Sequence, residues 1–145
     1  MKMNDYQKLK AKHQAEVNAF PMGFAFSQAQ FEEGMKALGL TPSDAGKIYA
    51  ISGTGGFYRR TDITALHEMF RRRRQELEEA IQSDATGDGF IFQMFDCELA
   101  DHEYGYSGDL DETLDALGFT MEDINADPRL AHGLEKAIAH QIKAI

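Results

Sequence analysis

Apolar residues recur along most of the chain at the spacing of amphipathic helices. The clearest case is the C-terminal segment, where a stripe repeats every four residues at Leu130, Leu134, Ile138 and Ile142. Such a stripe must face either a core or a partner. A second long helix is predicted over 63–81. Further helices are predicted over 4–18, 28–38, 90–104, 109–118 and a short segment that begins at Thr120.

Short runs of β-branched and aromatic residues interrupt this helical pattern. Ile48–Ser52 and Phe57–Arg60 flank the cluster Gly53–Gly56, which predicts a β-hairpin over 48–60. A hairpin turn is favoured over a phosphate-binding loop, because no Gly-Lys-Ser/Thr follows the cluster to open a helix. A candidate third strand lies at 24–26. The predicted fold class is α+β, mostly helical, with a small antiparallel β-sheet.

The N-terminal segment has few apolar positions and ends at Phe20-Pro21. Proline lacks the amide hydrogen and restrains the residue before it, so a helix stops here. We therefore predict a polar N-terminal helix over 1–20, followed by a single globular α+β domain over 21–145.

One stretch of the sequence is repeated. Phe31–Asp44 aligns without gaps on Leu110–Asp123, with identical residues at six of 14 positions. Each copy predicts a helix, a glycine C-cap at Gly39 or Gly118, and a threonine N-cap with an acid three residues later. Either an ancient duplication or convergence on good capping residues accounts for the likeness.

Composition is that of an intracellular globular protein. A chain of 145 residues with 43% hydrophobic content is sufficient for one domain. The single cysteine, Cys97, excludes an intramolecular disulfide framework and points to a reducing compartment. No apolar run approaches the ~20 residues of a membrane span. Met1–Val17 is too polar for a secretory signal. We expect a cytoplasmic protein.

The charge is unevenly distributed. Residues 1–83 carry 12 Lys/Arg against 10 Asp/Glu, and residues 128–145 carry 3 against 1, so each part has a net charge of +2. The 44 residues from Asp84 to Asp127 hold 13 Asp/Glu and no Lys or Arg, which accounts for the net charge of −9. Such asymmetry bears on the choice of partner rather than on the fold.

Arg71–Arg74 is the main basic cluster. Four consecutive arginines spread around most of a helix, so a solvated or internally paired group is favoured over a nucleic-acid patch. If these arginines met the acidic segment, they would neutralise it.

A loop after the long helix resembles the first part of a calcium-binding EF-hand loop. Asp84, Thr86 and Asp88 supply oxygens at positions 1, 3 and 5, with Gly89 at position 6. Position 12 is Phe95, where the motif requires a bidentate glutamate. A helix-loop-helix turn is therefore favoured over a metal site, and these residues remain a weak metal candidate.

No catalytic motif occurs in the sequence. The histidines lack the spacing of a zinc site, and Cys97 lies in no redox or nucleophile motif. We expect no enzymatic activity and no cofactor, although an active site assembled in space would leave no such signature.

Four segments resemble a family of small uncharacterised proteins encoded by phages and conjugative elements of gut bacteria. They are 26–40, 65–70, 86–91 and 114–118. The resemblance implies no activity or site residue. It implies a genetic context in which inhibitors of host defence, including anti-CRISPR proteins, are common.

The leading hypothesis is a non-enzymatic protein that inhibits a host CRISPR nuclease or restriction enzyme. Its acidic segment would bind the enzyme's basic nucleic-acid channel, and it would not bind nucleic acid or membrane itself. The candidate partner-binding residues are Asp96, Asp101, Glu103, Asp109, Asp111, Glu112 and Asp115. One alternative is a homodimer or adaptor that uses the stripe Leu130, Leu134, Ile138 and Ile142. Another is a calcium-binding helix-loop-helix module.

Overall fold

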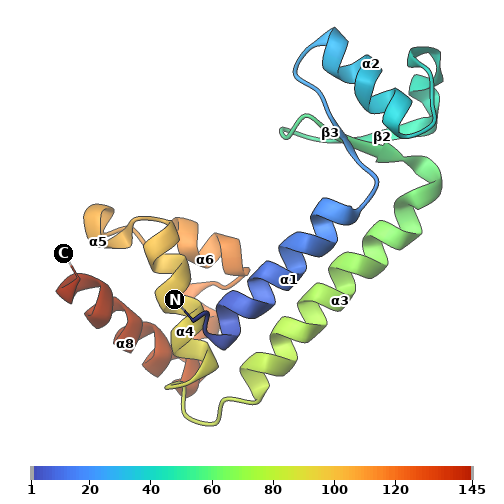
Figure 1. Cartoon of the computed structure of the whole chain (residues 1–145). Helices are drawn as coiled ribbons and strands as arrows, with labels where there is room; N and C mark the ends of the chain where they lie inside the picture. The colour runs from blue at the N-terminus through green and yellow to red at the C-terminus, as the bar shows by residue number, and fades with distance from the viewer. Residues whose placement is uncertain (1, 145) are drawn as a thin grey trace. The chain divides into compact units, whose positions relative to one another are not determined.

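The computed structural model describes residues 2–144, which are mostly helical with a three-stranded antiparallel sheet (Figure 1). The α+β class is therefore confirmed. Within these residues the chain divides into two compact units. We call residues 14–74 the sheet unit, and the described part of 1–13 and 75–145 the helical unit. α1 (Asp5–Ala19) and α3 (Ile63–Gln82) contribute residues to both. The division into a helix over 1–20 and one domain over 21–145 stays a prediction.

The sheet has the strand order β1-β3-β2, and all of its pairs are antiparallel. β2 (Ile48–Ile51) and β3 (Gly56–Arg59) form the predicted hairpin. The third strand, β1 (Gly23–Phe24), begins one residue before the predicted 24–26 and is shorter. Gly23 pairs with Phe57, and a Cβ atom at this position would lie 2.3 Å from the Phe57 ring. A glycine is therefore required where β1 crosses the ring.

Helices cover both faces of this sheet (Figure 1). Phe57 packs against Met35 and Leu38, which come from α2 (Gln28–Ala37) and its C-cap. The next residue, Tyr58, points to the opposite face and packs against Leu66 and Met69 of α3. Two 3₁₀ helices, η1 (Pro42–Lys47) and η2 (Arg60–Asp62), flank the hairpin.

The helical unit is built around α4 (Phe90–Asp101) and α8 (Pro128–Lys143), which lie side by side. α5 (Tyr104–Ser107), α6 (Asp111–Leu117) and α7 (Met121–Ala126) complete it. Four of its most deeply buried side chains come from α4, namely Ile91, Met94, Phe95 and Leu99.

The apolar stripe of α8 faces this core. Leu130 and Leu134 are buried in it, and Ile138 packs against it. Ile142 is 55% exposed. Three of the four candidate oligomer-face residues therefore pack inside their own unit, which leaves Ile142 as the exposed member.

The repeated sequence adopts the same local structure in both units. Leu40 N–H donates to the Met35 carbonyl at 2.8 Å, and Phe119 N–H donates to the Leu114 carbonyl at 3.0 Å. The intervening glycines, Gly39 and Gly118, have φ values of 74° and 75°. These are the features of Schellman caps. The capping boxes predicted at Thr41 and Thr120 also form, with Asp44 and Asp123.

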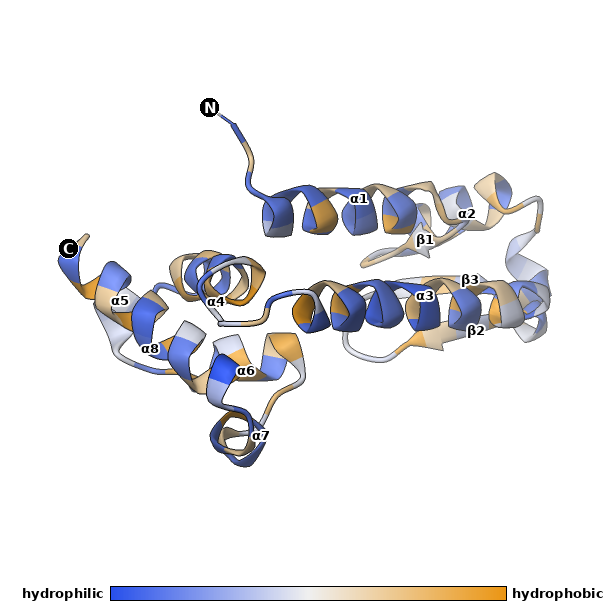
Figure 2. Ribbon diagram, turned by 90° about the horizontal axis from the view of Figure 1, so that it is seen from below, coloured by the Kyte–Doolittle hydropathy of each residue, from blue (hydrophilic) through white to orange (hydrophobic). Residues whose placement is uncertain are grey.

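α1 and α3 are hydrophilic along most of their lengths, as Figure 2 shows. The buried residues of α1 are Tyr6 and His13, so its burial depends on polar side chains. No helix within residues 2–144 combines the length and the apolar character needed to cross a bilayer.

Candidate functional site

The acidic segment Asp84–Asp127 belongs to the helical unit. Of the seven candidate partner-binding residues, two lie on α4, three on α6 and two in the connections that flank α5. The α4 residues are Asp96 and Asp101, the α6 residues are Asp111, Glu112 and Asp115, and the connections carry Glu103 and Asp109. Their side chains fall into two classes that the sequence does not distinguish.

The two α4 carboxylates are engaged inside the unit. Asp96 Oδ1 lies 2.7 Å from His140 Nδ1 and accepts a hydrogen bond of 2.7 Å from Gln141 Nε2. Asp101 Oδ2 accepts a hydrogen bond of 2.8 Å from Lys10 Nζ. Asp96 thus faces α8, and Asp101 faces α1. These two residues do not form one surface.

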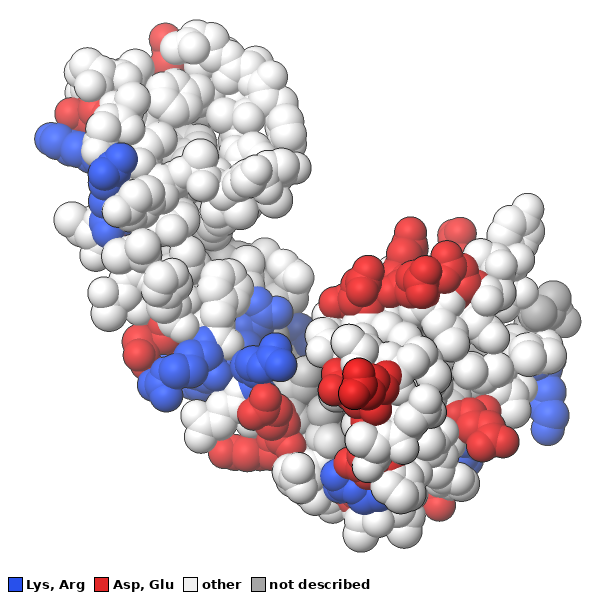
Figure 3. Space-filling model, turned by 180° about the vertical axis from the view of Figure 1, so that it is seen from behind, with Lys and Arg blue, Asp and Glu red and all other residues white. Residues whose placement is uncertain are grey.

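The other five carboxylates are exposed, and none forms an ion pair with a Lys, Arg or His side chain among residues 2–144. We call Glu103, Asp109, Asp111, Glu112 and Asp115 the acidic edge. Figure 3 shows acidic side chains gathered in a row along one edge of the helical unit. The acidic edge is therefore a negative surface that the described part of the chain leaves without cationic partners.

Arg71 and Arg72 form ion pairs outside the acidic segment. Arg71 pairs with Glu68 at 2.6 Å, and Arg72 pairs with Glu16 at 3.3 Å. The Arg73 guanidinium lies over the Phe70 ring, 5.5 Å from its centroid. These contacts all lie within the sheet unit, so none of them neutralises the acidic edge.

The EF-hand-like loop is held by Asp84, whose side chain is buried. Its Oδ1 accepts amide hydrogen bonds from Thr86 and Gly87, and its Oδ2 accepts them from Gly89 and Ile91, at 2.9–3.1 Å. Burial alone would raise the pKa of Asp84, but these amide donors outweigh it and lower the pKa below its usual value. Both oxygens are thus used to order the loop and the start of α4.

The other two weak metal candidates also have partners within the chain. Thr86 Oγ1 accepts the Asp88 amide at 3.1 Å, and the Asp88 carboxylate contacts His132 and Lys136 of α8. Within residues 2–144, no three His, Cys, Asp or Glu side chains group as metal ligands would. The loop works as a structural connector, and calcium binding by it stays a prediction.

A buried polar network joins α1 to α4 and was not predicted. Glu98 is 5% exposed and accepts hydrogen bonds from Tyr6 Oη at 2.8 Å and Lys10 Nζ at 2.7 Å. Burial, together with the bond to Glu98, raises the pKa of Tyr6. The sequence contained one indication of a buried carboxylate: Glu98 comes four residues after Met94 and therefore falls on the apolar face of α4.

Cys97 lies beside this network as an unreactive thiol. Burial and the nearby charge of Asp101 raise its pKa to about 11, so it stays protonated at neutral pH. The reactive thiolate form of Cys97 is therefore scarce at neutral pH.

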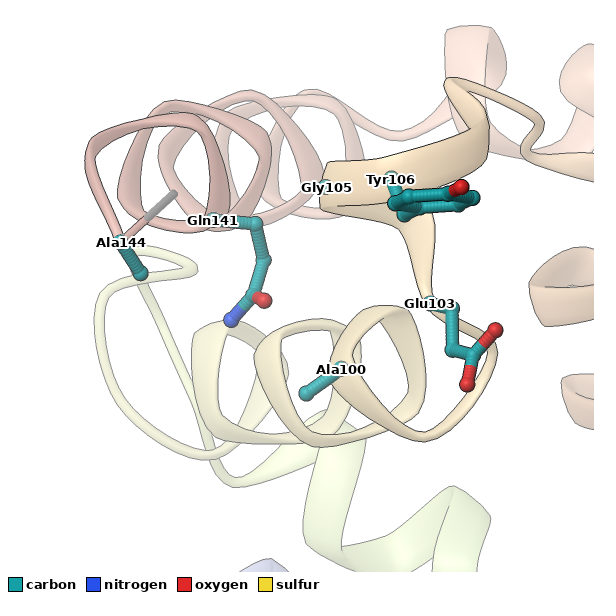
Figure 4. Close-up of a pocket in the computed structure, with 6 residues that line it drawn as sticks. All are labelled: Ala100, Glu103, Gly105, Tyr106, Gln141 and Ala144. Carbon is teal, nitrogen blue, oxygen red and sulfur yellow. The ribbon is translucent and has the colours of Figure 1, made fainter.

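The predicted helix over 90–104 is interrupted near its end, and this creates a pocket. α4 stops at Asp101, and Glu103 adopts a left-handed conformation with φ of 55° before α5 begins. The pocket beside this turn has a volume of about 490 Å³ (Figure 4). It is lined by Ala100, Glu103, Gly105, Tyr106, Gln141 and Ala144.

Glu103 occupies a position that suits glycine. A left-handed conformation costs a residue with a Cβ atom roughly 1–2 kcal/mol. Because glycine also loses more chain entropy on folding, we expect Glu103→Gly to raise the free energy of unfolding by about 0.5–1 kcal/mol. Gly39 has a φ of 74° and open space around it, so Gly39→Ala should lower the free energy of unfolding by about 1 kcal/mol. Urea unfolding of both variants tests this, and a destabilised Glu103→Gly would contradict it.

Comparison with known proteins gives a family and no function. No curated protein and no solved structure matches the chain significantly. One family model, described as a family of unknown function (DUF7659), matches residues 5–140 and so spans both units. The chain therefore belongs to the DUF7659 family.

Proposed function

We propose that the protein is a non-catalytic inhibitor that binds the basic nucleic-acid channel of a host defence enzyme through its acidic edge. The enzyme is a CRISPR nuclease or a restriction enzyme, and the interaction takes place in the cytoplasm. An origin on a phage or conjugative element belongs to the same proposal. It is supported by the resemblance of segments 26–40, 65–70, 86–91 and 114–118.

The proposal rests mainly on five exposed carboxylates within residues 103–115 that lack cationic partners in the described chain. A channel that binds DNA or RNA presents Lys and Arg side chains at the spacing of phosphates. Carboxylates on a rigid surface compete for the same cations. A field of one sign also raises association rates by about 10–10³-fold at low salt. The paired residues Asp96 and Asp101 contribute less, because they already have partners.

The test is inhibition of DNA cleavage by a purified Cas9-type nuclease and a restriction enzyme. We expect inhibition of at least one enzyme at low salt that is relieved as salt rises, because screening weakens the surface charges. Glu112→Lys/Asp115→Lys should weaken it at least about tenfold. Glu32→Lys/Glu33→Lys on α2 makes the same charge change on an exposed helix of the sheet unit and should leave inhibition within about twofold.

Two results would count against the proposal. One is that neither enzyme is bound or inhibited at low salt. The other is that both charge-reversal variants weaken inhibition equally, which would show that net charge acts without a defined surface.

A further inference from the structure

The pocket at the end of α4 is lined by one carboxylate and five uncharged residues, three of which are small. Ala100, Gly105 and Ala144 leave the space open, because none has a side chain larger than a methyl group. No lining residue is positively charged. The pocket lies entirely within the helical unit, next to the acidic edge, with which it shares Glu103.

The electrostatics of the pocket favour a cation. Ala100 lies in the last turn of α4, and Ala144 is the C-cap residue of α8. Helix C-termini carry partial negative charge from their unpaired carbonyls. The Glu103 carboxylate adds a full negative charge. Gln141 donates its amide hydrogens to Asp96, so its Oε1 remains an acceptor.

Tyr106 adds an aromatic surface to the same pocket. Its side chain is 95% exposed, which is unusual for a large ring in a folded unit. Figure 4 shows the ring edge-on, on the same side of the pocket as the Glu103 carboxylate. The face of an aromatic ring and a carboxylate both attract a cation, so these two groups favour the same kind of ligand.

We propose that this pocket receives an arginine side chain of the protein partner. A guanidinium is planar and can stack on the Tyr106 ring while it donates two parallel hydrogen bonds to the Glu103 carboxylate. A lysine ammonium is a compact point charge and would use the pocket less completely. The identity of the partner rests on the proposed function. The preference for an arginine side chain rests only on the residues that line the pocket.

The test uses the full chain and short peptides. Acetyl-Gly-Arg-Gly-amide is titrated while amide resonances are followed by NMR, with the citrulline and lysine peptides as uncharged and charged controls. We expect saturable shifts at Gly105, Tyr106 and Ala144 with the arginine peptide. Binding of the citrulline peptide should be at least tenfold weaker, and that of the lysine peptide at least threefold weaker.

Matched variants locate the site. Glu103→Gln and Tyr106→Ala should each weaken arginine-peptide binding at least fivefold, whereas Glu122→Gln, at an exposed position of α7 outside the acidic edge, should leave it unchanged. Equal binding of the arginine and citrulline peptides, or shifts that persist in Glu103→Gln, would overturn the inference. Peptide binding without nuclease binding would refute the proposed function alone. Nuclease binding without peptide shifts would refute the pocket alone.

Discussion

Asp84→Ala is expected to lower the free energy of unfolding by about 3–5 kcal/mol. Asp84 is 8% exposed, and its carboxylate accepts hydrogen bonds from four backbone amides of the loop and the start of α4. Alanine leaves these donors without their acceptor, and two of them, the amides of Gly87 and Ile91, take part in buried hydrogen bonds. Because α4 supplies four fully buried side chains of the helical unit, the loss should reach the core.

Asp84→Asn is the matched variant. Its amide retains one acceptor oxygen, so it should keep about half of the stabilisation and lose about 2 kcal/mol. Urea unfolding of both variants measures the effect. A loss below about 1 kcal/mol in Asp84→Ala would show that water or other groups replace the carboxylate.

The same residue predicts part of the acid sensitivity. Its pKa is lower in the folded chain than in the unfolded chain, so the folded state holds the proton less tightly. The stabilisation is therefore present above the unfolded pKa of about 3.9 and is lost as the pH falls through the lower, folded value. Asp84→Asn should flatten the decline in stability below about pH 4. If stability falls equally steeply with pH in Asp84→Asn, other carboxylates cause the acid sensitivity.

Gly133→Ala is expected to lower the free energy of unfolding by about 2–3 kcal/mol, against the usual preference of helices for alanine. Gly133 lies in α8, and an added Cβ atom would lie 2.5 Å from Ile91 Cγ2 and 2.9 Å from the Gly87 carbonyl oxygen. The backbone carbonyl has little freedom to move, because Gly87 itself donates its amide to Asp84.

Two controls separate this clash from a general effect of alanine. Gly46→Ala, where no atom lies within 4 Å of the new Cβ, should change the stability by less than about 0.5 kcal/mol. Gly133→Ala should cost less in an Ile91→Ala background, because that change removes the nearest atom. Strict additivity of the two substitutions would contradict the packing explanation.

Local structure was largely predictable because its causes are local. Capping boxes at Thr41 and Thr120 and the glycine C-caps depend on residues within one turn, and the structure has them. The Gly53–Gly56 hairpin follows from the same kind of short-range signal. The end of α4 was missed, because Glu103 takes a backbone conformation that its residue type disfavours.

The candidate site was predictable only in part, because pairing between distant segments decides which charges are free. Asp101 and Asp109 look alike in sequence, yet Lys10 pairs with the first, whereas the second has no cationic partner among residues 2–144. The sequence pattern of the α8 stripe was similarly compatible with burial in a core or against a partner. In the structure, Leu130 and Leu134 are buried in the core. Glu98 shows the converse case, a buried carboxylate whose partners come from α1.

The central claim is that the acidic edge steers a basic enzyme to this protein. The most direct measurement is the association rate with the nuclease at ionic strengths of about 0.05 and 0.15 M, for the wild type and the two charge-reversal variants. We expect the wild-type rate to fall steeply with salt. Glu112→Lys/Asp115→Lys should associate at least about tenfold more slowly at low salt, whereas Glu32→Lys/Glu33→Lys should match the wild type. Equal rates for the two variants, or a wild-type rate independent of salt, would contradict the claim.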